Sequence, residues 1–333
     1  MFHLRNYPYA DYHRTLICMG PIFLLMGLNV FINFSFLENF WLFLSGAMLS
    51  FTLTGANKIE QSINIFLFTF IAATLTLFTT WFQHEFTRPL FLGVLTLLIF
   101  LTLCLPRVLD VTANATRLLC LFITVAGSTF LVPPSDYSWK IVGVEFLAVL
   151  GGGLSCLLIN LCLPKLSIEK PPLIRSTYLY KKSFRLALGI LIAFIICDIL
   201  KLTHPSWAAF AILFASRDTQ PDSLHRAFER LTGTFAGVIV GVPLALVLFK
   251  PYPHSHFLIL VFLMIANLVG KKSYWLAMFF VTVSFGALYY IVTPGYGSPT
   301  VFILERFAET ALGVAILVSM EFFVFPTKTP RSA

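Results

Sequence analysis

Apolar segments alternate with short polar stretches along the whole chain, a pattern typical of a protein that crosses a membrane many times. Two of the segments, residues 206–216 and 256–269, are shorter than the roughly 20 residues that a straight transmembrane helix requires. We expect these two to be tilted, broken or re-entrant. The pattern predicts an all-α polytopic membrane protein with about twelve transmembrane helices. The twelve segments cover residues 17–37, 40–56, 63–82, 89–106, 117–132, 140–163, 184–200, 206–216, 231–249, 256–269, 273–292 and 300–325.

The composition agrees with this pattern, because 58% of the residues are hydrophobic and only 11% are charged. A soluble domain carries about a quarter charged residues. The six cysteines lie inside or beside apolar segments, and none forms a C-x-x-C pair. We therefore interpret them as small hydrophobic residues and predict no disulfide, no metal site and no cofactor.

The basic residues gather on one side of the membrane if the N-terminus is taken as cytoplasmic. Eighteen of the 23 Lys and Arg residues then lie inside, which predicts two cytoplasmic termini and an even number of spans. The net charge of +8 follows from this topology and requires no nucleic-acid partner. No small-residue cleavage site follows the first apolar segment, so residues 1–16 are predicted to be a cytoplasmic tail. The other five basic residues are Arg88, Lys140, Lys201, Lys250 and Arg306.

A polar interruption divides the chain into two halves of six segments each. Its sequence, PKLSIEKPPLIRSTYLYKK, contains three prolines and five basic residues, which indicates an exposed linker. The halves show weak similarity, with Trp41 opposite Trp207, and six spans per half would make the two repeats parallel. Chance similarity between two Phe- and Leu-rich stretches is the alternative. The predicted organisation is a tail (1–16), a first membrane repeat (17–163), a cytoplasmic linker (164–183), a second membrane repeat (184–326) and a C-terminal cytoplasmic tail (327–333).

One helix of the second half begins with basic residues and continues with glycines. Arg226 and Arg230 are four residues apart, so they lie on one helix face. Gly233 and Gly237 have the same spacing, which allows a neighbouring helix to approach closely. The alternative to a binding role is structural, with the arginines anchoring a helix end and the glycines serving in packing.

A second helix places charges among apolar residues. Residues 303–318 read ILERFAETALGVAILV and include Glu305, Arg306 and Glu309. A charge near the centre of a membrane helix costs roughly 2.5–3.5 kcal/mol, so something must compensate for it. We expect Arg306 to pair with Glu309, three residues further along the helix. That pair would serve either in transport or only in holding the helix in its bundle.

These two segments together resemble the fusaric acid resistance (FUSC) family of membrane transporters, and more distantly the aluminium-activated malate transporters of plants. Both elements follow in the family's order in the second half, whereas the first half has about Asn64 and Val144 opposite Arg230 and Arg306. The first half therefore departs from the pattern at both arginines. The first matching element comprises Trp207, Arg226, Arg230, Gly233, Thr234 and Gly237, and the second comprises Arg306, Glu309, Thr310 and Gly313.

The resemblance implies a transporter of the bacterial inner membrane that exports aromatic or other organic carboxylic acids, with a periplasmic adaptor protein as a further expected partner. Arg306 would offset the charge of the anion inside the bilayer, and Glu309 would neutralise Arg306 or carry a proton. Arg226 and Arg230 would collect anions at the cytoplasmic mouth, and Trp207 would stack on an aromatic ring of the substrate. Gly233, Gly237 and Gly313 would serve in helix packing.

Two other classes of function stay open at this point. A passive anion channel needs a continuous pore, which two six-helix repeats in one chain permit. A membrane enzyme or a structural subunit of an assembly is less well supported, because no H-E-x-x-H, G-x-S-x-G or P-loop motif occurs. The seven histidines lie in loops or at helix ends, and only His254 and His256 are close together. We therefore predict that the protein is not an enzyme.

Overall fold

The computed structural model describes residues 58–107, 113–128, 139–162, 178–249, 258–270, 272–292 and 298–324, together with residues 20 and 45. This part of the chain is all-helical, which confirms the predicted fold class. The predicted segments 17–37 and 40–56 lie outside the described residues, apart from Gly20 and Ser45. The prediction of twelve spans in two repeats therefore extends beyond what the structure describes.

Each predicted segment from 63–82 onward corresponds to one helix. In the first half these are α3 (Lys58–Glu85), α4 (Arg88–Cys104) with a short 3₁₀ turn η3 (Leu105–Arg107), α5 (Ala113–Ala126) and α6 (Trp139–Cys162). In the second half they are α7 (Tyr178–Leu200), α8 (Pro205–Ala215), α9 (Gln220–Leu244) with a π-helical turn η5 (Ala245–Phe249), α10 (Leu258–Val269), α11 (Tyr274–Val292) and α12 (Pro299–Phe323). Helix α7 thus begins inside the range 164–183 that the sequence assigns to a linker.

Four helices among the described residues are long and apolar enough to cross a membrane: α3, α6, α7 and α9. Helix α12 has 25 residues, but every 18-residue stretch of it contains at least three of Glu305, Arg306, Glu309 and Glu321. Helix α8 has only 11 residues, as its short apolar segment predicts. These helices make the chain an integral membrane protein in which two elements of the second half, α8 and α12, are unusual.

Proline and hydroxyl residues define where several helices begin. Helices α4, α8, α9 and α12 have proline in the first two positions, where the missing N–H has no intrahelical partner to lose. The side chains of Thr219 and Ser298 accept backbone N–H groups at the starts of α9 and α12. Near the other end of α9, Pro243 removes a backbone donor, and the helix widens into η5 directly afterwards.

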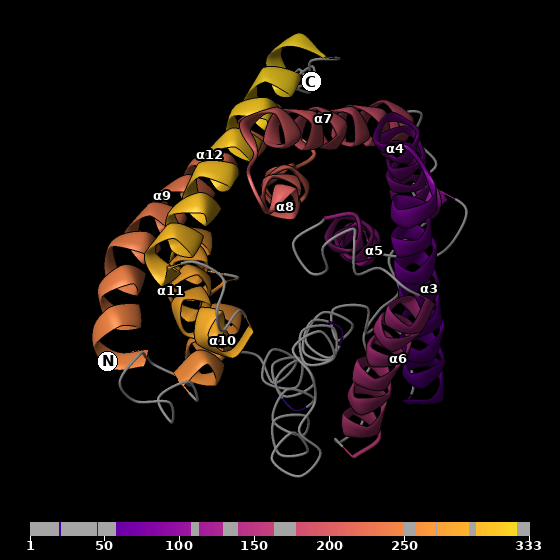
Figure 1. Cartoon of the computed structure of the whole chain (residues 1–333), viewed down its shortest axis with the longest axis horizontal. Coiled ribbons are helices and arrows are strands. Elements are labelled where there is room, and N and C mark those ends of the chain that lie inside the picture. The colour runs from indigo at the N-terminus through magenta and orange to yellow at the C-terminus, as the bar shows by residue number, and fades with distance from the viewer. Residues whose placement is uncertain are drawn as a thin grey trace, which may run out of the picture.

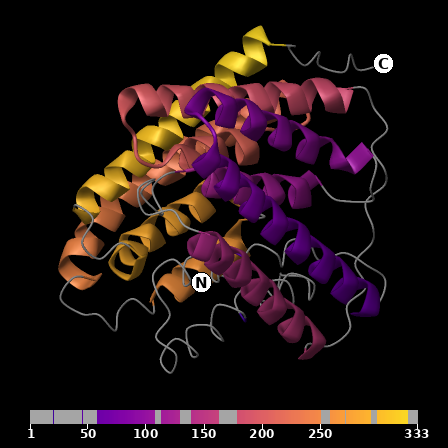
Figure 2. The ribbon, with the colours of Figure 1, turned by 45° about the vertical axis from the view of Figure 1, so that its right-hand side comes forward.

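Several corresponding pairs of helices pack together in the two halves. Helix α3 contacts α5 and α6, and its counterpart α9 contacts α11 and α12. Helices α4 and α5 pack in the first half as α10 and α11 do in the second. Figure 1 shows α9–α12 on the left and α3, α4 and α6 on the right, and Figure 2 shows the same ribbon after a turn of 45°. The packing is consistent with a repeat of one helical framework.

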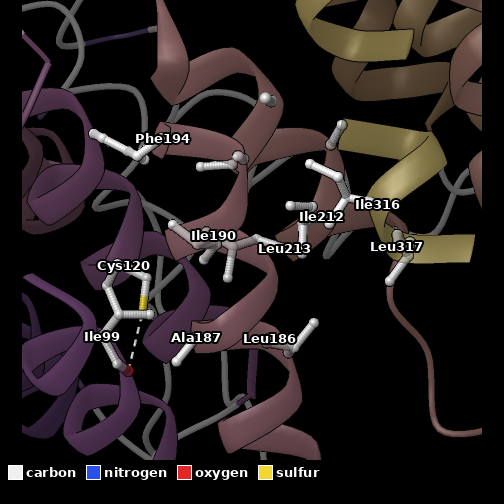
Figure 3. Close-up of a cluster of buried hydrophobic side chains, with 14 of the residues drawn as sticks. Ile99, Cys120, Leu186, Ala187, Ile190, Phe194, Ile212, Leu213, Ile316 and Leu317 are labelled. Carbon is white, nitrogen blue, oxygen red and sulfur yellow. Dashed lines mark hydrogen bonds between the residues drawn. The ribbon is translucent and has the colours of Figure 1, made fainter. Parts of the chain in front are cut away.

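An apolar core joins the two halves (Figure 3). It brings Ile99 of α4 and Cys120 of α5 together with Ile190 of α7, Ile212 of α8 and Ile316 of α12. The Cys120 thiol donates to the carbonyl oxygen of Ile99, with Sγ and O 3.8 Å apart. Because α7 and α8 contact helices of both halves, this core fixes the position from which α8 enters the candidate site.

Candidate functional site

The N-terminus of α8 lies beside the charged part of α12. The backbone N–H of His204, the residue before α8, donates to Glu309 Oε1 at 2.7 Å. A carboxylate at this position complements the positive end of the helix dipole. Glu309 is fully buried, and its second oxygen, Oε2, has no hydrogen-bond partner among the described residues.

Aromatic rings surround this helix start. The ring centroids of His204 and Trp207 are 4.5 Å apart, and that of Phe302 in α12 lies 5.0 Å from Trp207 and 5.3 Å from His204. All three side chains are buried. The site therefore offers ring faces and edges next to its charged groups.

Arg306 projects over one of these rings. Its guanidinium carbon lies 5.0 Å from the centroid of the Trp207 ring, within the range of a cation–π interaction. Arg306 and Glu309 do not form the expected salt bridge, although their charges lie close enough to interact. The Glu309 carboxylate instead binds the backbone N–H of His204 at the start of α8, which lies within hydrogen-bond distance. Its other oxygen has no hydrogen-bond partner among the described residues.

A third basic group approaches from α9. Arg230 is 5% exposed, and its guanidinium is near enough to Arg306 for the two positive charges to interact. Arg230 Nη1 donates to the hydroxyl oxygen of Tyr274 at 2.8 Å. Arg226, one turn earlier on the same face, lies over the ring of Tyr274 at 3.7 Å and contacts Glu229 Oε2 at 3.2 Å.

Three glycines hold the helices that carry these groups close together. A Cβ atom at Gly233 would collide with the backbone oxygen of Trp275, and one at Gly237 would lie 2.6 Å from Thr282 Cβ. These contacts place α11 directly against α9. At Gly313 a Cβ atom would collide with the backbone oxygen of Ala208, which places α8 directly against α12. The close approach brings Trp207 to Arg306 and Tyr274 to Arg230.

The structure gathers Arg306, Glu309, Trp207 and Arg230 in one buried region, with Arg226 at its edge. Sequence reasoning missed two members of this region, His204 and Tyr274. His204 lies at a helix end as expected, yet it is only 5% exposed. A signal for it was the position directly before the P-S-W start of the short apolar segment. Tyr274 gave no signal, because a lone tyrosine at a helix start has no distinctive spacing.

A buried ion pair lies near the other end of α12. Arg185 Nη2 of α7 and Glu321 Oε1 of α12 are 2.8 Å apart, and both side chains are almost fully buried. The sequence assigned Arg185 to the cytoplasmic side and gave no partner for it. Nearby, Lys182 Nζ donates to Asp218 at 2.6 Å, and this bond and charge lower the pKa of the Asp218 carboxyl. These contacts connect α7 to α12 and to the loop before α9.

The described residues contain no group of three metal-binding side chains. The pair His254 and His256 lies outside the described residues.

Comparison with known proteins gives one match. The family model described as fusaric acid resistance protein-like matches residues 191–320, which include every residue of the candidate site. No curated protein matches the chain, and no solved structure matches it either. The match confirms the resemblance to the fusaric acid resistance family, and it covers the last part of α7, all of α8–α11 and most of α12. The more distant similarity to aluminium-activated malate transporters stays a prediction.

Proposed function

We propose that the protein exports organic carboxylic acids, because residues 191–320 match the fusaric acid resistance protein-like family, which is associated with membrane transport and efflux. The proposed location is the bacterial inner membrane, with both termini in the cytoplasm. The observation that carries the proposal is the buried set of Arg306, Trp207 and Glu309, in which one carboxylate oxygen has no partner.

Arg306 serves as the cation that receives the substrate carboxylate. Glu309 does not form an ion pair with it, so the anion need not displace Glu309 from the guanidinium. Moving a carboxylate out of water is costly unless a positive charge and hydrogen bonds replace its hydration. Arg306 provides the charge inside the helical bundle, where Arg230 adds a second positive charge nearby.

The rings beside Arg306 favour an aromatic acid. Trp207 and Phe302 meet edge to face, with an angle of 82° between their planes. An aromatic substrate whose carboxylate binds Arg306 can extend its ring toward this pair. We therefore propose aromatic carboxylic acids as the preferred substrates within the larger class.

Glu309 serves in proton coupling or in substrate release. Its free oxygen, Oε2, is a position for a proton close to the anion site. When this carboxyl is protonated, its charge no longer repels the substrate, and when it loses the proton it favours release. The alternating charge couples anion movement to proton movement.

The decisive experiment measures uptake of radiolabelled benzoate into proteoliposomes that contain the purified protein. We expect saturable, proton-dependent flux, and Arg306→Ala should lower it by about tenfold to a hundredfold, since a hydrogen bond to a charged group contributes about 1.5–3 kcal/mol. Glu309→Gln should keep binding but impair proton dependence. Glu145→Gln is the matched control, because it alters a buried glutamate of α6 in the first half.

A purely structural role for these charges gives other results. If Arg306 and Glu309 only stabilise the bundle, the double variant Arg306→Met with Glu309→Met should transport normally. An active double variant would end the transport role. Voltage-dependent currents without saturable or proton-dependent flux would instead favour the passive anion channel. The periplasmic adaptor protein stays a prediction from the family resemblance.

A further inference from the structure

Tyr274 fills the space between two arginines of the candidate site. It is the first residue of α11 and is 7% exposed. The guanidinium of Arg226 covers its ring face at 3.7 Å from the centroid, and Arg230 donates to its hydroxyl oxygen at 2.8 Å. One side chain thus presents a ring to one arginine and an oxygen to the other.

Arg230 carries its charge against neutral partners only. Besides the Tyr274 hydroxyl it contacts the sulfur of Met278 at 3.5 Å, and its Nε has no hydrogen-bond partner among the described residues. No carboxylate of the described residues forms an ion pair with Arg230. A buried cation with neutral acceptors and a spare donor is costly to maintain and gains much from an anionic oxygen.

Arg226 is only partly neutralised. It contacts Glu229 at 3.2 Å, and its Nε also lacks a partner among the described residues. Its planar face is occupied by the Tyr274 ring, which is the geometry in which a guanidinium stacks on an aromatic group. The two arginines therefore form a recognition site for a ring that carries an oxygen, and Tyr274 is its present occupant.

We propose that Tyr274 is a specificity-determining residue that holds the place of the substrate between Arg226 and Arg230. Before it reaches Arg306, an arriving aromatic acid displaces the tyrosine side chain, stacks its ring on Arg226 and places its carboxylate on Arg230. Acids without a ring gain less, because they cannot replace the stacking contact. Tyr274 thereby closes the site against aliphatic anions. This inference rests on the proposed export of carboxylic acids.

Close packing limits the movement to the side chain. Helix α11 contacts α9 at Gly233 and Gly237, where no room for even a Cβ atom exists. The helix cannot slide toward α9 without a collision between backbones. Tyr274 precedes this contact region at the start of α11, so rotation of its side chain opens the site while the two helices stay packed.

The test compares the binding of two acids of similar size to the purified full-length protein in detergent. Benzoate has a flat aromatic face, and cyclohexanecarboxylate has the same carboxylate on a saturated ring. Isothermal titration calorimetry gives the Kd of each acid for the wild type, Tyr274→Phe and Tyr274→Leu. Tyr180→Leu, which alters a tyrosine of α7 that is 42% exposed, is the matched control.

We expect Tyr274→Leu to bind both acids about tenfold more tightly than the wild type, because neither acid then has to displace the tyrosine. Benzoate should remain the tighter ligand of both proteins, since only its ring stacks on the Arg226 guanidinium. Tyr274→Phe should give a smaller gain for both acids, because its ring still covers Arg226 and only the contact with Arg230 is lost. Unchanged or weaker binding of benzoate, or equal binding of the two acids, overturns the inference. If Tyr274→Leu does not fold, Tyr274→Phe decides by the same criterion.

The proposed function and this inference fail in different ways. If the wild type neither binds nor transports any of these acids, the proposed function fails. If the wild type transports benzoate and Arg306→Ala lowers the flux as expected, while the Tyr274 variants keep the wild-type Kd values, only the inference about Tyr274 fails.

Discussion

The two halves differ in how each satisfies a buried glutamate of its last described helix. In the first half, Glu145 of α6 is fully buried and accepts a hydrogen bond from Thr80 of α3 at 2.6 Å. In the second half, Glu309 of α12 keeps an oxygen without a partner, and Arg230 of α9 keeps a free donor. A buried polar group without a partner is costly, so it persists where a ligand or a function compensates for it.

The difference indicates a division of roles between the halves. The positions opposite Arg230 and Arg306 are about Asn64 and Val144, so the first half lacks the arginines of the second. Several of its helix pairs correspond to pairs of the second half. We interpret the first half as a support that holds α7 and α8 in place, and the second half as the part that binds the anion.

The comparison of the halves depends on parallel repeats, which place corresponding positions on the same side of the membrane. Cysteine labelling tests this, because each position reacts from one side only. In a cysteine-free background, Lys140→Cys lies in the first turn of α6 and Ser298→Cys directly before α12. Both variants should react with a membrane-impermeant maleimide that is added outside the cell. Lys181→Cys and His225→Cys should react only from inside. All four residues are exposed. Labelling of Lys140→Cys and Ser298→Cys from opposite sides would break the repeat.

Variants of the buried ion pair between α7 and α12 test whether these charges stabilise the fold or serve in transport. Glu321→Ala leaves Arg185 buried without its partner and should lower the free energy of unfolding by about 3–5 kcal/mol. Thermal unfolding in detergent measures this. Arg185→Met combined with Glu321→Met should restore most of the stability. Restored stability with normal transport would show that this pair only holds the two helices together.

The last helix of each half contains a glycine, and alanine substitutions compare the packing around them. Gly313→Ala should destabilise the protein by about 1–3 kcal/mol, because the added Cβ collides with the Ala208 backbone. Gly143→Ala of α6 is the control, since a Cβ there meets no atom within 4 Å. Melting temperatures of the two variants should differ in this order. Equal values would show that α8 can move away from α12.

A partly exposed ion pair between the halves should give the smallest effect. Arg88 of α4 donates two hydrogen bonds to Asp198 of α7, both at 2.8 Å, and each side chain is about one-third exposed. Arg88→Gln should lower stability by about 0.2–1 kcal/mol, and less at high salt, where screening weakens the pair. Melting curves at low and high ionic strength check this. A larger, salt-independent loss would mean that this contact is essential for joining the halves.

Much of the helical framework could be predicted from the sequence. Long apolar segments and basic loops have strong local signals, so most helices from α3 onward match the predicted segments within a few residues. The starts of α9 and α7 differ most: α9 begins at Gln220 rather than at 231, and α7 at Tyr178 rather than at 184, because polar and charged residues lower the hydropathy there. In α7, Lys182 and Arg185 find acidic partners in other elements.

The candidate site could be predicted only in part. Arg306, Glu309, Arg230 and Trp207 carry charge or a motif, and the structure brings all four together. The sequence could not predict which groups pair within the site. Whether Glu309 binds Arg306 or the His204 N–H depends on where α8 begins in space. Such a contact between residues 105 positions apart leaves no periodic pattern in the sequence.

Helix α8 has a consequence for how the chain is assembled during synthesis. At 11 residues it is about 16 Å long, too short to reach water on both sides of a bilayer. Its first turn depends on Glu309, and the carbonyl of Ser216 at its end accepts a hydrogen bond from Arg117 of α5 at 3.0 Å. Arg117 leaves the ribosome before α8, but Glu309 follows it by about a hundred residues. Helix α8 therefore reaches its final environment only after α12 has been inserted, so truncation before α12 should leave α8 exposed to cellular proteases.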